Sequence, residues 1–455
     1  MEGYSLQFRQ LEFVGALAAI TNTPAHTIES RLSFENAMSM EDNNNDDSNR
    51  SEEHTKRMLP KTKLDAFNEA TQYIVLNNTV NDKEHADTLQ SSFHSTRPNV
   101  VITNDILCQA VQRCSLVHAL YRVIAFVADG SYNDLNKAAM AAKEPPFAKN
   151  ESWRLRVRHF QQQIRYGARA RSMQRERTAL QALDPFLATL GGKVRLDNPD
   201  WSIYIFDSLR STNDKLLTKR IARGPRVSVI APNTRICVTN TPLCPLAAFT
   251  MVNVASIRSN HAVLDPYAGS GAILLAAAMV APSSRTVGIE IAHNGVVNRN
   301  DIQKDFTTRQ LTPPRGLLQG DCTDPMMRVM ARIMASSTGK EEPFDCIVTD
   351  PPYGIRESHY QLSDKNDTLD ENSVLEPIEQ LLNCIIQDRQ AGTPLLKKGG
   401  KLVVFVPVTF EQTINGCLPD QDLLDRAGVV LESKQEQPLN EKLSRWMVAF
   451  RCIHV

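Results

Sequence analysis

The sequence has no hydrophobic run long enough to cross a bilayer and no recognisable targeting segment. Its longest apolar stretches, residues 123–128 and 273–280, are far shorter than the roughly 20 residues that a membrane-spanning helix requires. Residues 1–5 lack the charged and apolar regions of a signal peptide. We therefore expect a cytoplasmic protein without membrane contact.

Paired cysteines and net charge are also absent. The nine cysteines are scattered, without a Cys-x-x-Cys motif or a histidine at metal-ligand spacing. This pattern predicts reduced thiols in an intracellular protein and no metal site in this chain. The formal net charge is +0, so contact with nucleic acid would require a local basic surface.

The length and composition predict two domains. A chain of 455 residues with 42% hydrophobic content can form more than one independent core. The acidic stretch at residues 41–53 contains no apolar residue, which predicts a disordered insertion near residues 36–58. The composition shifts after Ala222. We expect an α+β region over residues 1–225 and a second domain over residues 226–455.

Local periodicity gives further expectations for the N-terminal region. A period of two in residues 4–8 predicts a short strand, followed by a helix over residues 13–20. A helical pattern covers residues 100–128. Arginines alternate with apolar residues over 154–158, which predicts a strand.

Seven short β-rich runs alternate with helical stretches in the second half of the chain. This alternation is typical of a doubly wound, Rossmann-like α/β domain whose ligand lies at the carboxyl ends of the strands. The runs are residues 262–264, 286–289, 317–318, 346–348, 402–406, 429–431 and 447–450.

A glycine turn with the sequence DPYAGSG follows the first run, at residues 265–271. Its glycines allow a ligand to approach the backbone at the start of the next helix. Glu290 ends the second run, where a carboxylate can accept from both ribose hydroxyls, and Asp321 ends the third. Nicotinamide-binding folds use the same turn, so the turn alone does not choose the cofactor. The predicted cofactor-binding residues are Asp265, Tyr267, Gly269, Gly271, Glu290, Asp321 and Cys322.

The tetrad DPPY at residues 350–353 follows the fourth run directly. Asp350 supplies a carboxylate, and Pro351 fixes the backbone so that a main-chain carbonyl lies beside it. These acceptors can hold the hydrogens of an exocyclic amine while an aromatic ring stacks on the base. The alternative is a proline-rich turn without catalytic function. With the glycine turn, the tetrad predicts amino methyl transfer from S-adenosylmethionine and not nicotinamide chemistry. The predicted catalytic residues are Asp350, Pro351, Pro352 and Tyr353.

The most basic segment of the chain lies between the two halves. Five arginines fall within thirteen residues and are opposed by Glu176 alone. They form either a solvated helix face or a phosphate-contacting patch, because arginine forks match phosphate oxygens. The predicted RNA-binding residues are Arg165, Arg169, Arg171, Arg175 and Arg177.

The chain resembles the eukaryotic and archaeal tRNA guanine-N2 methyltransferases that modify the guanosine at position 10. The resemblance rests on LDPYAGSG at residues 264–271, DPPYGIRE at 350–357 and LSRWMV at 443–448, with a faint match of FRQLE at 8–12. It implies a Rossmann-like, seven-stranded class I methyltransferase domain preceded by an α+β THUMP-type RNA-binding domain. It also implies tRNA as the substrate and a small zinc-binding activator subunit as the partner.

The resemblance leaves some points open. The implied activator adds a strand to a sheet edge, and we expect the apolar run at 447–450 to be that edge. The stretch TPLCPL at residues 241–246 lacks the acidic residues that the resemblance places there. A nucleic-acid adenine-N6 methyltransferase, which uses a similar tetrad, is the alternative enzyme. A non-catalytic RNA-binding scaffold is the alternative outside enzymes.

Overall fold

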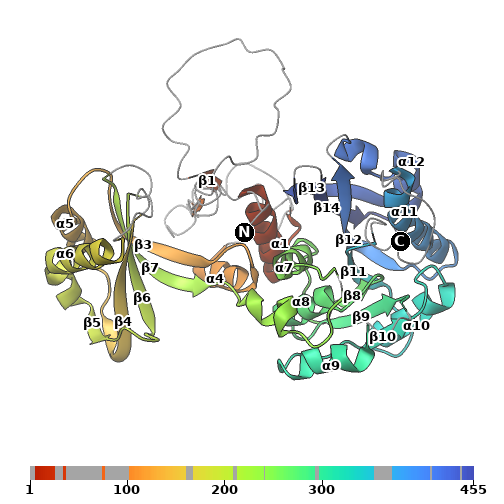
Figure 1. Ribbon diagram of the computed structural model, residues 1–455, viewed down its shortest axis with the longest axis horizontal. Coiled ribbons are helices and arrows are strands. Elements are labelled where there is room, and N and C mark those ends of the chain that lie inside the picture. The colour runs from red at the N-terminus through yellow and green to blue at the C-terminus, as the bar shows by residue number, and fades with distance from the viewer. Residues whose placement is uncertain are drawn as a thin grey trace, which may run out of the picture.

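The computed structural model contains two large sheets with their helices and a small two-stranded sheet, and Figure 1 shows α4 (Asn104–Arg113) between the two large sheets. Most of the predicted insertion, residues 37–58, lies outside the described residues, as do Arg165 and Tyr353. The described residues are 6–25, 34–36, 74–76, 102–159, 168–208, 213–239, 241–292, 297–352, 371–409, 412–440 and 443–454.

Five strands form the sheet of the N-terminal module. Two helices, α5 (Tyr132–Ala141) and α6 (Ala168–Thr189), cover one face and bury apolar residues of alternating strand positions, such as Leu155 and Ile203. In spatial order the strands are β3 (Ala119–Val127), β7 (Lys215–Arg223), β6 (Trp201–Asp207), β4 (Phe147–His159) and β5 (Gly191–Val194). A separate pair joins β1 (Phe34–Asn36) to β2 (Ile74–Leu76).

The other face of this sheet carries aromatic and basic side chains. Tyr204 and Phe206 alternate with the helix-facing residues of β6 and contact Tyr121, with ring centroids 5.4 and 5.0 Å apart. The Arg220 guanidinium lies 5.9 Å from the Tyr204 ring centroid. The strand predicted over 154–158 is confirmed as part of β4.

The C-terminal module contains a seven-stranded sheet in which each predicted β-rich run lies within a strand. All neighbouring strands are parallel except β14, which runs antiparallel to both of its neighbours. In spatial order the strands are β10 (Gly316–Gln319), β9 (Arg285–Glu290), β8 (Ala262–Asp265), β11 (Phe344–Thr349), β12 (Leu396–Thr409), β14 (Leu443–Cys452) and β13 (Val429–Pro438).

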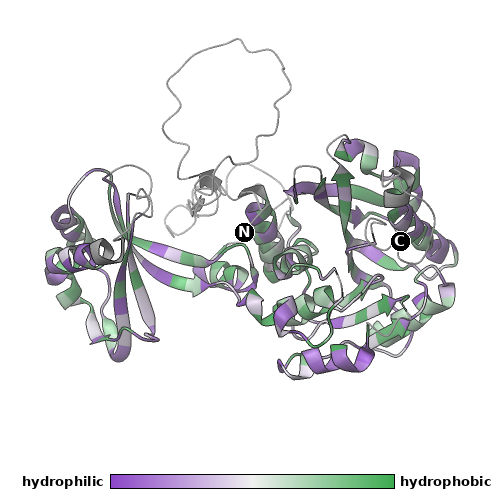
Figure 2. Ribbon diagram, in the orientation of Figure 1, coloured by the Kyte–Doolittle hydropathy of each residue, from purple (hydrophilic) through white to green (hydrophobic). Residues whose placement is uncertain are grey.

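Helices cover both faces of this sheet, so the doubly wound α/β domain predicted from the sequence is confirmed. One core includes α7 (Pro245–Val254), α8 (Ala272–Val280) and α9 (Arg299–Thr307). Figure 2 shows the apolar α8 in green and the polar α9 mainly in purple. The second core lies on the opposite face of the sheet. The helices of this second core are α10 (Pro325–Ala335), α11 (Glu371–Gln390) and α12 (Gln421–Ala427). Three 3-10 turns complete the described elements of this module: η1 (Val227–Ile230), η2 (Pro232–Thr234) and η4 (Ile414–Cys417).

The prediction that the run at 447–450 forms a sheet edge is wrong. This run belongs to β14, which pairs with β12 on one side and with β13 on the other. Met447, Val448, Ala449 and Phe450 are all fully buried, so their apolar character reflects an interior strand. Within the described residues, the outer strands of the sheet are β10 and β13.

The first helix, α1 (Leu6–Thr21), packs against α4 and α7. It begins at Leu6, so the short strand predicted over residues 4–8 is wrong from that residue on. The helix predicted over 100–128 is correct only for α4, because residues 119–127 form β3 and pair with β7.

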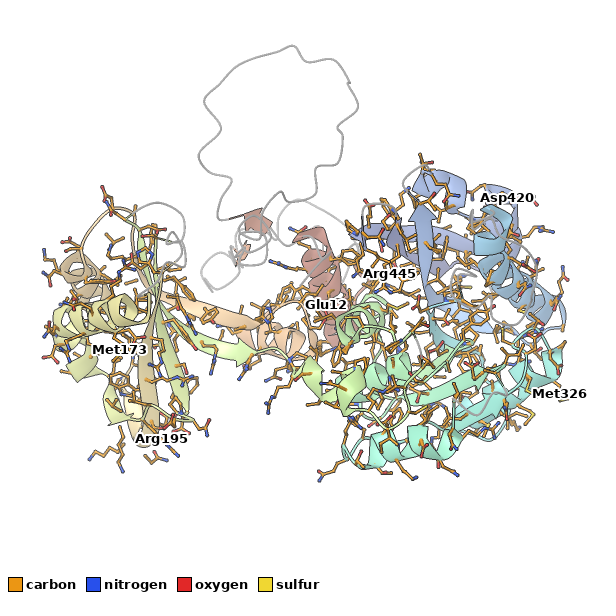
Figure 3. All side chains as sticks on the ribbon, in the orientation of Figure 1. Glu12, Met173, Arg195, Met326, Asp420 and Arg445 are labelled. Carbon is orange, nitrogen blue, oxygen red and sulfur yellow. The ribbon has the colours of Figure 1, made fainter. Side chains whose placement is uncertain are left out.

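Glu12 joins α1 to two other segments from inside the protein. Its carboxylate accepts hydrogen bonds from the backbone N–H of Ser115 (2.7 Å), the backbone N–H of Leu116 (2.8 Å) and the side-chain amide of Asn253 (3.3 Å). Burial raises the pKa of Glu12 to about 7. Figure 3 shows Glu12 between the two modules.

Candidate active site

Two aspartates stand side by side at the carboxyl ends of neighbouring parallel strands. Asp265 is the last residue of β8 and Asp350 directly follows β11, and these strands pair through Cys346 with Val263 and Ile347 with Leu264. The chain proceeds outward from β8 to β9 and β10, and in the other direction from β11 to β12. The two aspartates therefore lie at the topological switch point, where open α/β sheets bind their ligands.

Asp265 is the buried member of this pair, with 1% of its surface exposed. Its Oδ1 accepts hydrogen bonds from the Thr349 hydroxyl (2.7 Å) and the Tyr267 backbone N–H (3.2 Å). Burial raises the pKa of Asp265 to about 7, and the nearby carboxylates of Asp350 and Glu290 act in the same direction. A cationic ligand at this point would offset the clustered negative charge.

The glycine turn after β8 is open where a ligand would lie. Gly269 and Gly271 have φ of +50° and +78°, a conformation that side chains rarely adopt, and no atom lies within 4 Å of a Cβ built on Gly269. Glu290 closes the other side of the turn: its Oε2 accepts from the Gly269 N–H and its Oε1 from the Ala292 N–H, both at 2.8 Å. Each oxygen keeps a lone pair for a hydroxyl donor. These groups fit the ribose and sulfonium of S-adenosylmethionine.

A small pocket continues from the glycine turn along the ends of β9 and β10. It is lined by Ala268, Gly269, Glu290, Ala292 and Leu318, among others. Its lining is mainly apolar, with polar side chains from Glu290, Arg299 and Gln319, which suits a nucleoside.

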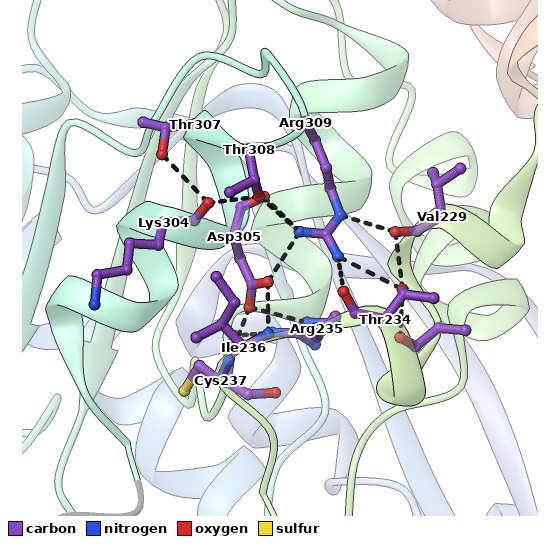
Figure 4. Close-up of polar contacts among 12 residues, drawn as sticks. Val229, Thr234, Arg235, Ile236, Cys237, Lys304, Asp305, Thr307, Thr308 and Arg309 are labelled. Atoms are coloured by element: carbon purple, nitrogen blue, oxygen red, sulfur yellow. Dashed lines mark hydrogen bonds and ion pairs between the residues drawn. The ribbon is translucent and has the colours of Figure 1, made fainter.

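A buried arginine holds the glycine turn from behind. Arg235 lies after η2 and donates a hydrogen bond to the Ser270 carbonyl, while its Nε is 3.6 Å from Asp305 Oδ2 on α9. Asp305 also accepts from the backbone N–H of Ile236 (2.8 Å) and from Arg309 Nη1 (2.9 Å), as Figure 4 shows. The turn is thus fixed before any ligand arrives.

The loop after β10 is supported in the same way. Asp321 is exposed and its Oδ1 accepts from the Thr323 backbone N–H (2.8 Å), whereas Cys322 is buried. Arg328 Nη1 donates to the carbonyls of Cys322 (3.2 Å) and Thr323 (2.6 Å). Its guanidinium in turn binds Asp388 on α11.

The tetrad is only partly described. Asp350 retains 22% side-chain exposure, Pro351 is buried and Pro352 is half-buried. Asp350 follows Cys346 and Val348 at intervals of two, so its side chain extends on the face of the sheet that α7 and α8 cover. A carboxylate there can accept a hydrogen bond from an amine presented at the strand ends.

The predicted RNA-binding arginines lie on the opposite module. Arg169 and Arg171 fall within α6, and of the cluster's side chains only Arg175, half-buried, and Arg177, exposed, are described. Among the residues that the structure describes, no group of three or more metal-ligating side chains is arranged to hold an ion. In the same ranges, no helix is both long and apolar enough to span a membrane.

The fold and the site resemble those of methyltransferase domains that use S-adenosylmethionine. Residues 232–365 match the UPF0020 family, the RMKL-like methyltransferase domain. The sequence is also similar to tRNA (guanine(10)-N2)-methyltransferase of Xenopus laevis, with 27% identity over 58% of this chain and 58% of that protein. The archaeal tRNA (guanine(10)-N2)-dimethyltransferase of Methanothermobacter thermautotrophicus is 27% identical over 54% of this chain and 64% of its own. The resemblance predicted from the motifs is thereby confirmed.

The match to these relatives is partial. The chain spans little more than half the length of the Xenopus laevis protein. Among solved structures, TrmN from Thermus thermophilus is 19% identical and covers 78% of this chain and 88% of its own, with a TM-score of 0.38.

Three arginines of the site were missed by sequence reasoning. Arg235 and Arg328 hold the two cofactor loops, and Arg445 on β14 contacts Asp350. Arg328 forms an i, i+4 pair with Arg332 within the otherwise apolar helix PMMRVMARIMA, and Arg445 lies within the motif LSRWMV. Neither pattern indicates what the arginine contacts, which becomes visible only when distant segments are brought together.

Proposed function

We propose that this protein is the catalytic subunit of a tRNA guanine-N2 methyltransferase that acts in the cytoplasm on the guanosine at position 10. The observation that carries the proposal is the placement of Asp265 and Asp350 on adjacent strand ends, with the glycine turn beside them. The similarity to tRNA (guanine(10)-N2)-methyltransferases supports guanosine as the acceptor.

The proposed mechanism relies on positioning. S-adenosylmethionine supplies an electrophilic methyl group when bound at Asp265, Glu290 and the glycine turn, with Asp321 beside the adenine. The guanine amine is a poor nucleophile because its lone pair is delocalised into the ring. Asp350 and the main chain near Pro351 would accept hydrogen bonds from its two N–H groups and so turn the lone pair toward the methyl group. The proton that the amine loses on methylation would pass to the Asp350 carboxylate. Tyr353 stacks on the base.

The N-terminal region is proposed to bind the tRNA. We assign residues 1–225 to a THUMP-like RNA-binding region and residues 226–455 to the methyltransferase domain. The arginines of α6 supply clustered positive charge for phosphates, and Arg177 is exposed for this contact. Arg154, Arg156 and Arg158 add three more guanidiniums along β4.

The activator subunit is proposed to bind at β10 instead of the C-terminal strand. Within the described residues β10 pairs only with β9, so its outer amides and carbonyls are available to an added strand. Helix α10 lies beside it and exposes an apolar stripe. Met334 of this stripe packs over Gly316, the first residue of β10, so edge and stripe form one surface. The stripe consists of Met326, Met330, Ile333 and Met334.

Replacing Met330 with glutamate is expected to weaken binding of the small zinc-binding activator about tenfold or more, because a charge would be buried without a partner. Affinity purification after co-expression of the full chain with the activator measures this. Met173→Glu, at a methionine exposed by 71% on α6, is the matched control and should retain the activator. Figure 3 shows Met173 and Met326 on different modules. Undiminished capture by Met330→Glu would contradict the assignment.

Replacing Glu290 with alanine should weaken S-adenosylmethionine binding by about 1–3 kcal/mol, the cost of a lost charge-assisted hydrogen bond. The loss has two sources, because Glu290 also accepts from the Gly269 N–H and shapes the turn. Isothermal titration calorimetry with S-adenosylmethionine measures the change. Glu342→Ala, which removes a half-buried partner of Arg285 at the opposite end of β9, is the control. Equal affinities for the two variants would remove Glu290 from the site.

The proposed function is tested on tRNA directly. Nucleoside mass spectrometry of tRNA from cells lacking the protein should show loss of N2-methylated guanosine with unchanged N6-methyladenosine. The full chain co-expressed with the activator should restore the mark from S-adenosylmethionine, whereas the chain expressed alone should be poorly soluble and inactive. An adenine product would support the alternative enzyme. Absence of S-adenosylmethionine binding would support a non-catalytic scaffold.

A further inference from the structure

Arg445 is a buried cation at the end of the sheet where the proposed chemistry takes place. It lies on β14 directly opposite Pro407 of β12 and Gln437 of β13. Only 8% of the residue is exposed. Arg445 precedes Met447 and Ala449, which belong to the core under α7 and α8, so its side chain extends on the same face as Asp350.

Two neighbours fix the guanidinium of Arg445. It lies over the ring of Phe405, with Cζ 4.1 Å from the ring centroid, and Nε donates a 2.7 Å hydrogen bond to Gln437 Oε1. Gln437 is itself buried, with 4% exposure. A planar guanidinium that stacks on one side and donates on another has little freedom to move, unlike a lysine ammonium.

The guanidinium so held faces Asp350. Arg445 Nη1 is 3.9 Å from Asp350 Oδ2, which is longer than a hydrogen bond but close enough for a strong Coulombic attraction in a partly buried site. The attraction acts on Oδ2 and so bears on the orientation of the whole carboxylate. Burial and the nearby Asp350 charge both raise the pKa of Asp265 on the neighbouring strand, so a cation at this position offsets clustered negative charge.

We infer that Arg445 is a positioning residue for methyl transfer: its guanidinium holds the Asp350 carboxylate ionised and in one orientation for the acceptor amine. The inference rests on the proposed role of Asp350. It gives β14 a part in the reaction. Arg445 is 95 positions after Asp350 in the chain, and the sheet brings the two residues together.

The test compares Arg445→Gln with Arg445→Lys in the full chain that methylates tRNA. Glutamine removes the charge, and we expect kcat to fall roughly 10- to 100-fold, the range for a reacting group displaced by about 1 Å. KM for S-adenosylmethionine should stay within about twofold, because Arg445 lies away from the glycine turn. Lysine keeps the charge and should recover a clear part of the lost kcat.

The matched control is Arg451→Gln. Arg451 lies on the same strand, and its Nε is likewise 3.9 Å from a carboxylate oxygen, that of Glu432, but far along β14 from Asp350. This variant should retain parental kcat. The inference is overturned if Arg445→Gln keeps kcat within twofold of the parent or if Arg445→Lys and Arg445→Gln lower kcat equally. It is also overturned if Arg445→Gln raises KM and leaves kcat unchanged.

A second measurement requires no activity. Thermal unfolding of the parent, Asp350→Asn, Arg445→Gln and the double variant forms a cycle, and the two shifts in midpoint should not be additive, because the residues interact. Additive shifts would overturn the contact. The activity of the parent on tRNA guanosine tests the proposed function. The cycle tests the interaction between Arg445 and Asp350, and it does so even for a chain that transfers no methyl group.

Discussion

Replacing Asp350 with alanine is expected to abolish detectable methyl transfer to tRNA while leaving tRNA affinity nearly unchanged. Asp350 is proposed to accept a hydrogen bond from one amine and to make no contact with phosphates. The loss of one preorganised polar group at a reacting centre lowers the rate roughly 10²- to 10³-fold. Its removal also leaves the buried Arg445 without this carboxylate. Transfer of labelled methyl from S-adenosylmethionine and filter binding of tRNA measure the two quantities.

The control for this experiment is Asp345→Asn. Asp345 lies on the same strand but at its start, where it binds Lys397 at 2.8 Å and accepts from the Ala262 N–H. Its replacement should leave the rate of methyl transfer close to that of the parent. Asp350→Ala with a rate within a few-fold of the parent would remove Asp350 from the catalytic assignment.

The second large effect concerns stability. Asp388 on α11 binds two buried guanidiniums, Arg328 at 2.8 Å and Arg332 at 2.6 Å. Replacing it with alanine leaves two buried cations short of a counter-charge, and breaking such a buried pair costs about 3–5 kcal/mol. We expect the unfolding midpoint of the C-terminal module in urea to fall accordingly. Because Arg328 also holds the loop after β10, affinity for S-adenosylmethionine should fall as well.

Asp422→Ala provides the comparison on the protein surface. Asp422 pairs with Arg426 at 3.2 Å on α12, and its side chain is 83% exposed. Exposed pairs contribute roughly 0–1 kcal/mol, so this variant should unfold close to the parent. Similar midpoints for Asp388→Ala and Asp422→Ala would mean that the buried arginines are stabilised by other groups.

The part of the fold that could be predicted is the part with short, continuous apolar runs. Residues 346–348 and 402–406 are buried on both sides between helices, so their sequence alone indicates interior parallel strands. Residues 119–127 were assigned to a helix because an apolar run has no clear period, and pairing with β7 decided the outcome. The prediction for residues 4–8 failed because so short an alternation fits a helix equally well.

The candidate site could be predicted only where a motif is local. The glycine turn and the tetrad each lie within one segment, and strand order brings them together as expected. Arg235, Arg328 and Arg445 act on backbone or side chains many residues away, and no local pattern identifies such partners. The prediction that the C-terminal strand forms an edge failed because no local pattern shows that β14, which follows β13 in the chain, inserts between β12 and β13.

The link between Glu12 and Asn253 sets an order of events during synthesis. The two residues are 241 positions apart, so at 5–20 residues per second Asn253 is made roughly 12–48 s after Glu12. During that interval Phe13 and Leu17 of α1 can pack against α4, whereas Phe8 packs in the core that includes α7, which does not yet exist. Helix α1 therefore completes its contacts long after its own synthesis. Chains that stop before α7 should aggregate through this N-terminal helix.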